Sequence, residues 1–237
     1  MRPELAWIAL AFLSGSIPFG LLIGRAKGID VRKAGSGNIG ATNVGRILGK
    51  RYFFLCFGLD LLKGLLPTLG AGWALGALGR VDVPAQEAWL WLAAMAAAVL
   101  GHVFCPWLKF KGGKGVATGL GALLGVFPVL TLAGAGVFVL WLLMLWRWRY
   151  ISLASIVGGA TLPLWVVGVF AWLGPGETLA IRAQSVFSQG FAFLLLASLL
   201  GVLVVWTHRA NIRRLRAGTE PKVGQRAVPS ASPPSAK

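Results

Sequence analysis

Three segments of this sequence carry residue types that bind anions, and each lies between long apolar stretches. The first, residues 28–46, crowds glycine, serine, threonine and asparagine together and ends at Arg46. Glycine lets a backbone approach a ligand closely, and successive N–H groups in such a turn form an anion-binding concavity. An arginine guanidinium adds parallel donors for phosphate oxygens. A glycine-rich linker is the alternative, but the segment predicts an anion site whose candidates are Ser36, Asn38, Thr42, Asn43 and Arg46.

The second segment, residues 101–118, contains the run Lys111-Gly-Gly-Lys-Gly115. It resembles a phosphate-binding loop that opens onto a helix N-terminus, where backbone donors and the helix dipole favour an anion. The Walker A spacing is absent, because residue 115 is glycine and no strand is expected before it, so an ATP site is not expected. We expect Lys114 to contact phosphate. The candidates here are His102, for which a structural role is the alternative, and Gly112, Gly113, Lys114 and Gly115.

The third segment, residues 207–220, follows the last apolar stretch and is strongly basic. On a continued helix, His208 and Asn211 are three residues apart and share one face. A basic helix on the membrane surface would explain the arginines, but it explains these two side chains less well. Ser152, close to Arg147 and Arg149, belongs to a smaller fourth cluster. We therefore add Ser152, His208 and Asn211 to the candidate site.

The acidic residues limit the chemistry that these segments can perform. Asp30 and Glu220 are the only acids in the strongly basic segments. Metal-dependent phosphoryl transfer therefore lacks its usual carboxylate ligands, and we expect no metal and no cofactor. Dipoles and cations that stabilise negative charge suit acyl or phosphoryl transfer without a metal. Asp60 and Lys63 lie inside an apolar stretch, where an ion pair at i and i+3 serves either structure or function.

The composition indicates where these segments must lie. Of the 237 residues, 57% are hydrophobic and 13% are charged, whereas a soluble domain has roughly 25% charged residues. A soluble enzyme is therefore excluded, and several stretches approach the roughly 20 apolar residues that a bilayer span needs. Cys56 and Cys105 predict no disulfide framework. The sequence predicts an all-α polytopic membrane protein with seven transmembrane helices, at residues 5–24, 52–78, 88–104, 116–127, 129–146, 151–173 and 191–207.

The positive charge indicates how these spans are oriented. With seven spans, most of the 23 Lys and Arg residues fall on one side of the membrane, and basic residues mark the cytoplasmic side. The N-terminus is then outside, the C-terminus inside and the candidate site cytoplasmic. A single helix over residues 116–146, which contains Pro128, would give six spans and move the basic C-terminal segment outside. The net charge of +16 thus serves orientation and contact with anionic lipid headgroups, and no nucleic-acid partner is expected.

One membrane domain is expected over residues 1–223. The first apolar stretch lacks a positive leader region and a small-residue cleavage site, so we interpret it as a retained span and not as a signal peptide. Residues 224–237 are rich in proline, serine and alanine, which predicts a disordered cytoplasmic tail.

The polar segments together resemble the bacterial acyl-phosphate:glycerol-3-phosphate 1-acyltransferase family. The resemblance lies in Gly-Ser-Gly-Asn-Ile-Gly-Ala-Thr-Asn at 35–43, Lys-Phe-Lys-Gly-Gly-Lys-Gly-Val-Ala-Thr at 109–118 and His-x-x-Asn-Ile-x-Arg-Leu-x-x-Gly-x-Glu at 208–220. Ser16-Ile-Pro-Phe-Gly20 and Asp60-Leu-Leu-Lys-Gly64 are also similar to motifs of that family. The motifs occur in order from residue 14 to residue 222, which is nearly the whole chain.

The resemblance implies an integral enzyme of the bacterial inner membrane with seven spans and a site that faces the cytoplasm. Such an enzyme transfers an acyl chain from acyl phosphate to the 1-hydroxyl of glycerol 3-phosphate and releases lysophosphatidic acid, the first step of phospholipid synthesis. The hydroxyl proton goes either to the leaving phosphate or to His208, and a covalent acyl-Ser36 is a third option. The motif positions imply catalytic roles for Ser36, Arg46, Lys114, His208 and Asn211, and substrate binding by Asn38, Thr42, Asn43, His102, Gly112, Gly113, Gly115 and Ser152.

Two other classes of function compete with this interpretation. An organic-anion transporter would also need anion sites, but it would place functional groups near the bilayer midplane in two related halves. Only Asp60 and Lys63 approach that depth, and the sequence contains no visible repeat. A structural partner of another lipid enzyme would leave the glycine-rich segments unexplained. The sequence therefore predicts the acyltransferase, with the transporter as the alternative.

Overall fold

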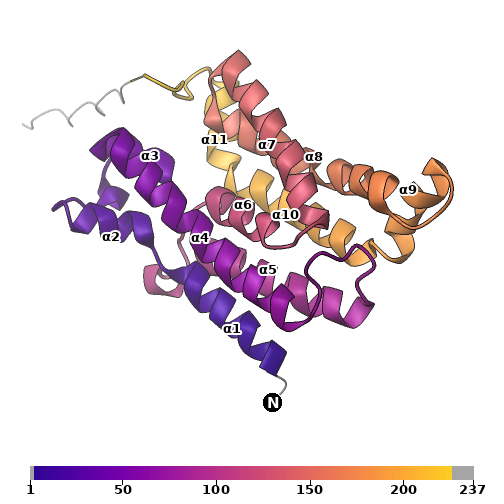
Figure 1. Ribbon diagram of the computed structural model, residues 1–237. Helices are drawn as coiled ribbons and strands as arrows, with labels where there is room; N and C mark the ends of the chain where they lie inside the picture. Colours follow the sequence, from indigo (N-terminus) through magenta and orange to yellow (C-terminus); the bar gives the residue numbers. More distant parts are fainter. Residues whose placement is uncertain (1–2, 226–237) are drawn as a thin grey trace, which may run out of the picture.

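The computed structural model describes residues 3–225, and that part of the chain contains helices but no strand (Figure 1). The all-α prediction is therefore confirmed. Two short 3-10 helices lie in loops, η1 (Val31–Lys33) and η2 (Pro106–Leu108). The α-helices are α1 (Pro3–Ser16), α2 (Phe19–Arg25), α3 (Ala41–Leu48), α4 (Lys50–Ala74), α5 (Ala85–Val103), α6 (Val116–Leu124), α7 (Val129–Trp148), α8 (Ile151–Leu173), α9 (Leu179–Ser188), α10 (Phe191–Thr207) and α11 (Arg209–Arg216). Most of the predicted tail, residues 226–237, lies outside the described residues.

Fewer helices than predicted are long enough to cross a membrane. The described residues contain five such segments, and the bent pair of α9 and α10, with an angle of 75° between them, is a sixth candidate. The predicted span at 116–127 contains only the nine residues of α6. This helix is about 14 Å long, which is too short for a hydrocarbon core of about 30 Å. Part of the apolar character of residues 116–127 is explained by packing, because Gly121, Ala122 and Leu123 are buried among other helices.

The first span is broken near its middle and is tied to α4 at the break. Pro18 lies between α1 and α2, and proline cannot donate the hydrogen bond that would continue a helix. At the break, the Ile17 carbonyl accepts hydrogen bonds from the Lys63 ammonium at 2.7 Å and from the Phe19 N–H at 3.1 Å. The same ammonium pairs with the Asp60 carboxylate at 2.7 Å. The predicted i, i+3 ion pair is therefore present, and it joins two helices.

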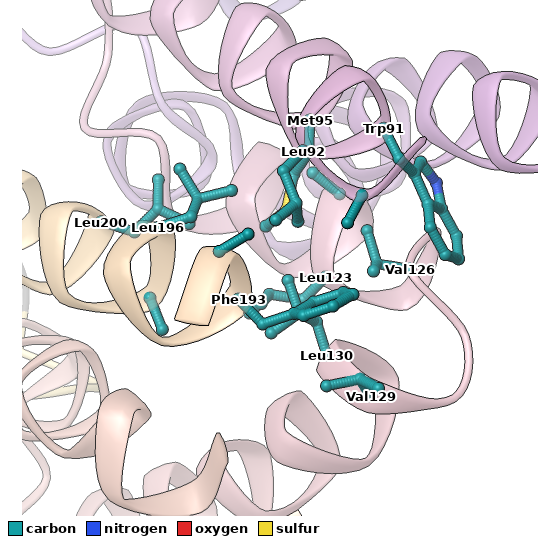
Figure 2. Packing of buried hydrophobic residues seen from close by; sticks show 14 of the residues in the cluster. Trp91, Leu92, Met95, Leu123, Val126, Val129, Leu130, Phe193, Leu196 and Leu200 are labelled. Carbon is teal, nitrogen blue, oxygen red and sulfur yellow. The ribbon is translucent and has the colours of Figure 1, made fainter. Parts of the chain in front are cut away.

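The helices form two groups with α6 and α10 between them (Figure 1). The helix pairs α1–α5, α1–α4 and α4–α5 pack together on one side, and α7–α8 and α8–α9 pack together on the other. Short α6 contacts α4, α5 and α7, while α10 contacts α5 and α8. Figure 2 shows the core at this junction, a single buried cluster that includes Trp91 and Met95 of α5, Leu123 of α6 and Phe193 of α10. The junction therefore joins both groups through buried apolar side chains.

Close backbone contact joins α4 and α6. In a membrane, helices pack by van der Waals contact between small residues, because lipid is as apolar as the side chains. A Cβ atom at Gly64 of α4 would lie 2.2 Å from the Thr118 carbonyl oxygen, and one at Gly121 of α6 would lie 1.9 Å from the Leu61 carbonyl oxygen. Both positions therefore require glycine. The contact holds the loop that precedes α6 beside the half of α4 that carries Asp60.

Gly121→Ala should therefore destabilise the protein, because the new methyl group meets the Leu61 carbonyl and forces α4 and α6 apart. Gly119→Ala is the matched control, since a Cβ atom at this position of the same helix has no heavy atom within 4 Å. We expect Gly121→Ala to unfold at a lower temperature in detergent. Gly119→Ala should match or exceed the wild type, because alanine favours a helix by roughly 1 kcal/mol over glycine. Equal unfolding temperatures for the two variants would contradict the contact.

Candidate functional site

A cavity of about 800 Å³ lies where the polar segments meet. Its walls come from α3, the start of α4, the loop before α6, the facing ends of α7 and α8, and α11 with the residues after it. Gly112 and Gly113 are the predicted site residues that do not line this cavity. The predicted residues that do line it are Ser36, Asn38, Thr42, Asn43, Arg46, His102, Lys114, Gly115, Ser152, His208 and Asn211.

The loop before α3 is held from inside by Asn43, which is buried. Its side-chain oxygen accepts a hydrogen bond from the Ser36 N–H at 2.8 Å. Its amide nitrogen donates to the carbonyl oxygens of Val31, Ala34 and Asn38 at 3.0, 3.2 and 2.8 Å. Both polar atoms of Asn43 are thus engaged within the chain, so the side chain fixes the loop, and the predicted contact with a substrate would require this network to open.

The same loop presents polar groups to the cavity. Asn38 accepts a hydrogen bond from the Gly40 N–H at 2.8 Å, just before α3 begins. Ser36 and Thr42 line the cavity, and only the backbone N–H of Ser36 is used in the Asn43 network. Arg46, in the last turn of α3, also lines the cavity. The loop therefore provides hydroxyl groups and one guanidinium.

The glycine loop before α6 uses its first two N–H groups internally. Gly112 N donates to the Val103 carbonyl at 3.0 Å, and Gly113 N donates to the His102 carbonyl at 3.1 Å. These two N–H groups are therefore not free for the anion cradle that the sequence predicts. The cation of the loop is in the predicted place, because the Lys114 ammonium donates a hydrogen bond to the Asn211 side-chain oxygen. The loop reaches the cavity through Lys114 and Gly115.

A buried carboxylate, Glu220, organises the opposite wall. Its Oε1 accepts hydrogen bonds from the Ser152 hydroxyl and from the Asn211 amide, each at 2.7 Å. Its Oε2 accepts from the Arg214 guanidinium at 2.7 Å. Burial raises the pKa of the Glu220 carboxyl, but these three donors outweigh burial and lower the pKa overall. Glu220 is therefore ionised at neutral pH and joins α8 to α11.

Several cations lie near Glu220, while the other carboxylate of the cavity lining, Asp60, is paired with Lys63. Burial and the nearby charges of Arg214 and Arg46 together lower the pKa of the Lys114 ammonium to about 8, against the opposite effect of Glu220. Burial also lowers the pKa of the Arg46 guanidinium, and Glu220 again opposes the shift. The positive charges of Lys114, Arg46 and Arg214 thus exceed the single charge of Glu220, so the cavity favours an anionic ligand.

His208 lies at the junction of α10 and α11 and is buried. Its Nδ1 is 2.8 Å from the Val204 carbonyl oxygen, and a carbonyl can only accept, so we assign the ring proton to Nδ1. Burial and the charge of Lys114 lower the pKa of the ring to about 4. The imidazole is therefore neutral at pH 7 and keeps an unprotonated Nε2.

One part of the cavity wall is apolar. Phe53, Phe54 and Phe57 of α4 line it from one side, and Trp141 and Leu145 of α7 line it from the other. The Trp141 N–H donates to the Ser155 hydroxyl at 3.1 Å, which satisfies its polar atom. The cavity therefore joins a cationic part with a wall that suits a hydrocarbon chain.

Some residues of the cavity are not predicted by the sequence motifs. From the sequence, Arg214 belongs to a basic surface helix, and Glu220 is only one of a few acids. A signal for Glu220 exists, since it is the only acid among the many basic residues of 207–222. No sequence signal separates Trp141 from the tryptophans that face lipid. The charged and aromatic lining residues that the site prediction omitted are Lys50, Phe53, Phe54, Phe57, Asp60, Trp141, Arg214, Glu220 and Lys222, and Leu145 is a further apolar one.

Within residues 3–225, no three His, Cys, Asp or Glu side chains gather closely enough to hold a metal ion. Cys56 and Cys105 are both buried free thiols. The cavity lining contains hydroxyl, amide, imidazole and carboxylate groups together with cations.

Comparison with known proteins supports one interpretation of this cavity. The family model described as glycerol-3-phosphate acyltransferase matches residues 5–218. The glycerol-3-phosphate acyltransferase of Geobacter sulfurreducens is 45% identical over 222 residues, which are 93% of this chain and 97% of the relative. That of Geotalea daltonii is 42% identical over 221 residues, or 93% and 97% of the two chains.

Two crystal structures are also similar to this chain. Both are of PlsY (YgiH), described as an integral membrane glycerol 3-phosphate acyltransferase. The glycerol 3-phosphate form has a TM-score of 0.75 and 38% identity, and it covers 93% of this chain and 96% of its own. The lysophosphatidic acid form has a TM-score of 0.72 and 37% identity, and it covers 93% and 95%.

Proposed function

Because this chain belongs to the glycerol-3-phosphate acyltransferase family, we propose that its cavity transfers an acyl chain from acyl phosphate to the 1-hydroxyl of glycerol 3-phosphate. The products are lysophosphatidic acid and inorganic phosphate. The observation that carries this proposal is the cavity itself, which combines a cationic part with an apolar wall. An acyl donor is an amphiphile and the acceptor is a small anion, so the two substrates match these two parts.

In this proposal, the cations of the cavity bind the phosphate groups of both substrates. Arg46 and Lys114 hold the phosphate of the acceptor, with Asn211 orienting the Lys114 ammonium through its hydrogen bond. Lys50 and Lys222 at the same cavity add positive charge for the second phosphate. Two phosphates of like charge repel each other in a partly buried site, so a surplus of cations favours their joint binding.

The acyl transfer then needs stabilisation of a developing oxyanion. The glycerol hydroxyl attacks the acyl carbon, a carbon–oxygen bond to glycerol forms, and the bond to phosphate breaks. The hydroxyls of Ser36 and Thr42 are the donors that we assign to the oxyanion, and one well-placed donor contributes about 3–4 kcal/mol to such a step. Ser152 is held by Glu220 at the opposite wall and orients the acceptor.

The hydroxyl proton goes to the leaving phosphate in our proposal. A phosphate group has a second pKa of about 6, whereas burial lowers the pKa of His208 to about 4. The phosphate is therefore the stronger base of the two, although the unprotonated Nε2 of His208 can accept a hydrogen bond from the acceptor. This mechanism requires neither a covalent acyl-Ser36 nor a metal.

We further propose seven crossings with the N-terminus outside, the C-terminus inside and the cavity at the cytoplasmic face of the inner membrane. One crossing is then made by short α6 together with the non-helical segments at its two ends, which is possible where such backbone is buried in protein. The support is the charge pattern, because the cationic residues of the cavity belong to the same basic segments that mark a cytoplasmic side. The remaining basic residues of these segments suit anionic lipid headgroups. A C-terminal reporter that is active only in the cytoplasm should be active, and an inactive but expressed reporter would reverse the orientation.

The function is tested with purified protein in detergent, glycerol 3-phosphate and palmitoyl phosphate, with palmitoyl-CoA in a parallel reaction. We expect equal amounts of inorganic phosphate and lysophosphatidic acid from palmitoyl phosphate, and none from the coenzyme A ester. Lys114→Ala, purified and folded, should make little of either product. Lysophosphatidic acid from palmitoyl-CoA alone would show that the proposed donor is wrong.

The low pKa of Lys114 predicts a specific pH dependence. The ammonium is charged below a pKa of about 8 and loses its proton above it, so binding of the anionic acceptor should weaken as pH rises. We expect kcat/KM for glycerol 3-phosphate to fall above about pH 8, because this parameter reports the ionisation of the free enzyme. Lys114→Arg, whose guanidinium stays charged, should lose this decline. A decline at the same pH in Lys114→Arg would assign it to another group.

His208→Gln separates the two proton acceptors. A general base contributes about 10²–10⁴-fold to the rate, so loss of an essential base would lower kcat by at least that factor. If the leaving phosphate takes the proton, we expect His208→Gln to lose less than about 100-fold in kcat, since glutamine can still donate to the Val204 carbonyl. A larger loss of kcat in folded protein would make His208 the base.

A further inference from the structure

A buried cluster of ionisable side chains lies beneath the loop that carries Lys114. Asp60 and Lys63 form an ion pair at 2.7 Å, with side chains that are only 3% and 2% exposed. The His102 ring is equally buried, and its Nδ1 lies 3.8 Å from Asp60 Oδ1. Burying two charges has a desolvation cost that can exceed their mutual attraction, so a buried ion pair is by itself weak evidence of stabilisation. Its position in the fold is the better guide to its role.

The His102 ring occupies the space that a side chain at residue 113 would fill. A Cβ atom at Gly113 would lie 2.0 Å from His102 Nε2, and its three nearest neighbours are all atoms of this ring. The same residue binds the loop through its backbone, because its carbonyl accepts from Gly113 N at 3.1 Å. His102 therefore fixes the distance between the backbone at Gly113 and α5. Lys114 is the next residue of the loop, so its position depends on the same contacts.

The other end of the cluster is anchored to the first span. The Lys63 ammonium donates to the Ile17 carbonyl at 2.7 Å, at the break between α1 and α2. The Ser14 hydroxyl donates to the Lys63 carbonyl at 3.1 Å. Asp60 thus lies between an anchored cation on one side and the His102 ring on the other.

We propose that Asp60, Lys63 and His102 form a positioning unit that fixes the backbone at Gly113, and through it the Lys114 ammonium, relative to α4 and the first span. This inference rests on the proposed function only in giving Lys114 an anionic substrate to hold. It assigns His102 to the support of the loop in place of the direct substrate contact that the sequence predicts. Asp60 and His102 also line the cavity, but the role assigned to all three residues is positioning, because they act on Lys114 through the loop.

The test is a comparison of one substitution, Gly113→Ala, in different backgrounds. In the wild type, the new methyl group meets the His102 ring, and we expect kcat/KM for glycerol 3-phosphate to fall at least about tenfold. In His102→Ala the ring is gone, so the same substitution should cost at most about twofold. If the factor lost in the double variant equals the product of the factors lost in the two single variants, the proposal is overturned. Such a product means that the free-energy changes are additive, as they are for residues that do not interact.

The charged pair is tested in a third background, Asp60→Asn with Lys63→Met. Both charges are removed together, because a single substitution would leave one buried charge uncompensated. If the ion pair holds the His102 ring in place in the wild type, the ring can move away from the new methyl group once the pair is removed. The loss of kcat/KM caused by Gly113→Ala should then be smaller in this background. An undiminished loss in this folded double variant would overturn the role of the pair.

Two further measurements separate positioning from stability and from the proposed function. Thermal unfolding of every variant identifies losses of activity that come from a weakened fold, and the comparison of kcat/KM is made only among variants that remain folded at the assay temperature. Equilibrium binding of glycerol 3-phosphate is measured on the same variants and should follow the same pattern as KM. If the wild type makes no lysophosphatidic acid, the proposed function fails, and the binding pattern alone then supports or overturns the positioning unit.

Discussion

The backbone contact between α4 and α6 is the constraint on which the site depends. A helix of nine residues cannot be held in a bilayer by its own length, so α6 is held by direct contact with its neighbours. Gly64 and Gly121 allow two backbones to meet where any side chain would separate them. Because α6 begins immediately after the glycine loop, this contact also determines where Lys114 lies. Helix packing in the membrane region thus controls the geometry of the polar site that lies at the start of α6.

The second constraint is the balance of charge around the cavity. Arg46, Lys114 and Arg214 are brought close together, and mutual repulsion would oppose this arrangement without a compensating acid. Glu220 provides that acid and also accepts hydrogen bonds from Ser152 and Asn211. Because it neutralises only part of the positive charge, an anionic substrate completes the balance. Burial, which Glu220 offsets only in part, lowers the Lys114 pKa to about 8.

The architecture suits a reaction between a lipid-soluble and a water-soluble molecule. Aromatic side chains of α4 and α7 form the apolar wall, and the three polar segments supply the cationic part. Loops that are held internally, such as the one fixed by Asn43, present a few free groups in fixed positions. Such preorganisation is what stabilises a developing charge without further rearrangement. Membership of the glycerol-3-phosphate acyltransferase family agrees with this division of the cavity.

The sequence by itself determined the helical class, the positions of the long spans and the family, because hydropathy and motifs are local properties of the chain. All of the candidate site residues that it predicted, except Gly112 and Gly113, line the cavity. Only the tertiary structure decided which of them are free, since Asn43, Gly112 and Gly113 turn their polar groups inward to satisfy the buried backbone. It likewise decided that Lys114 meets Asn211 and that Ser152 meets Glu220. These partners are far apart in the chain, so only the packing of the helices brings them together.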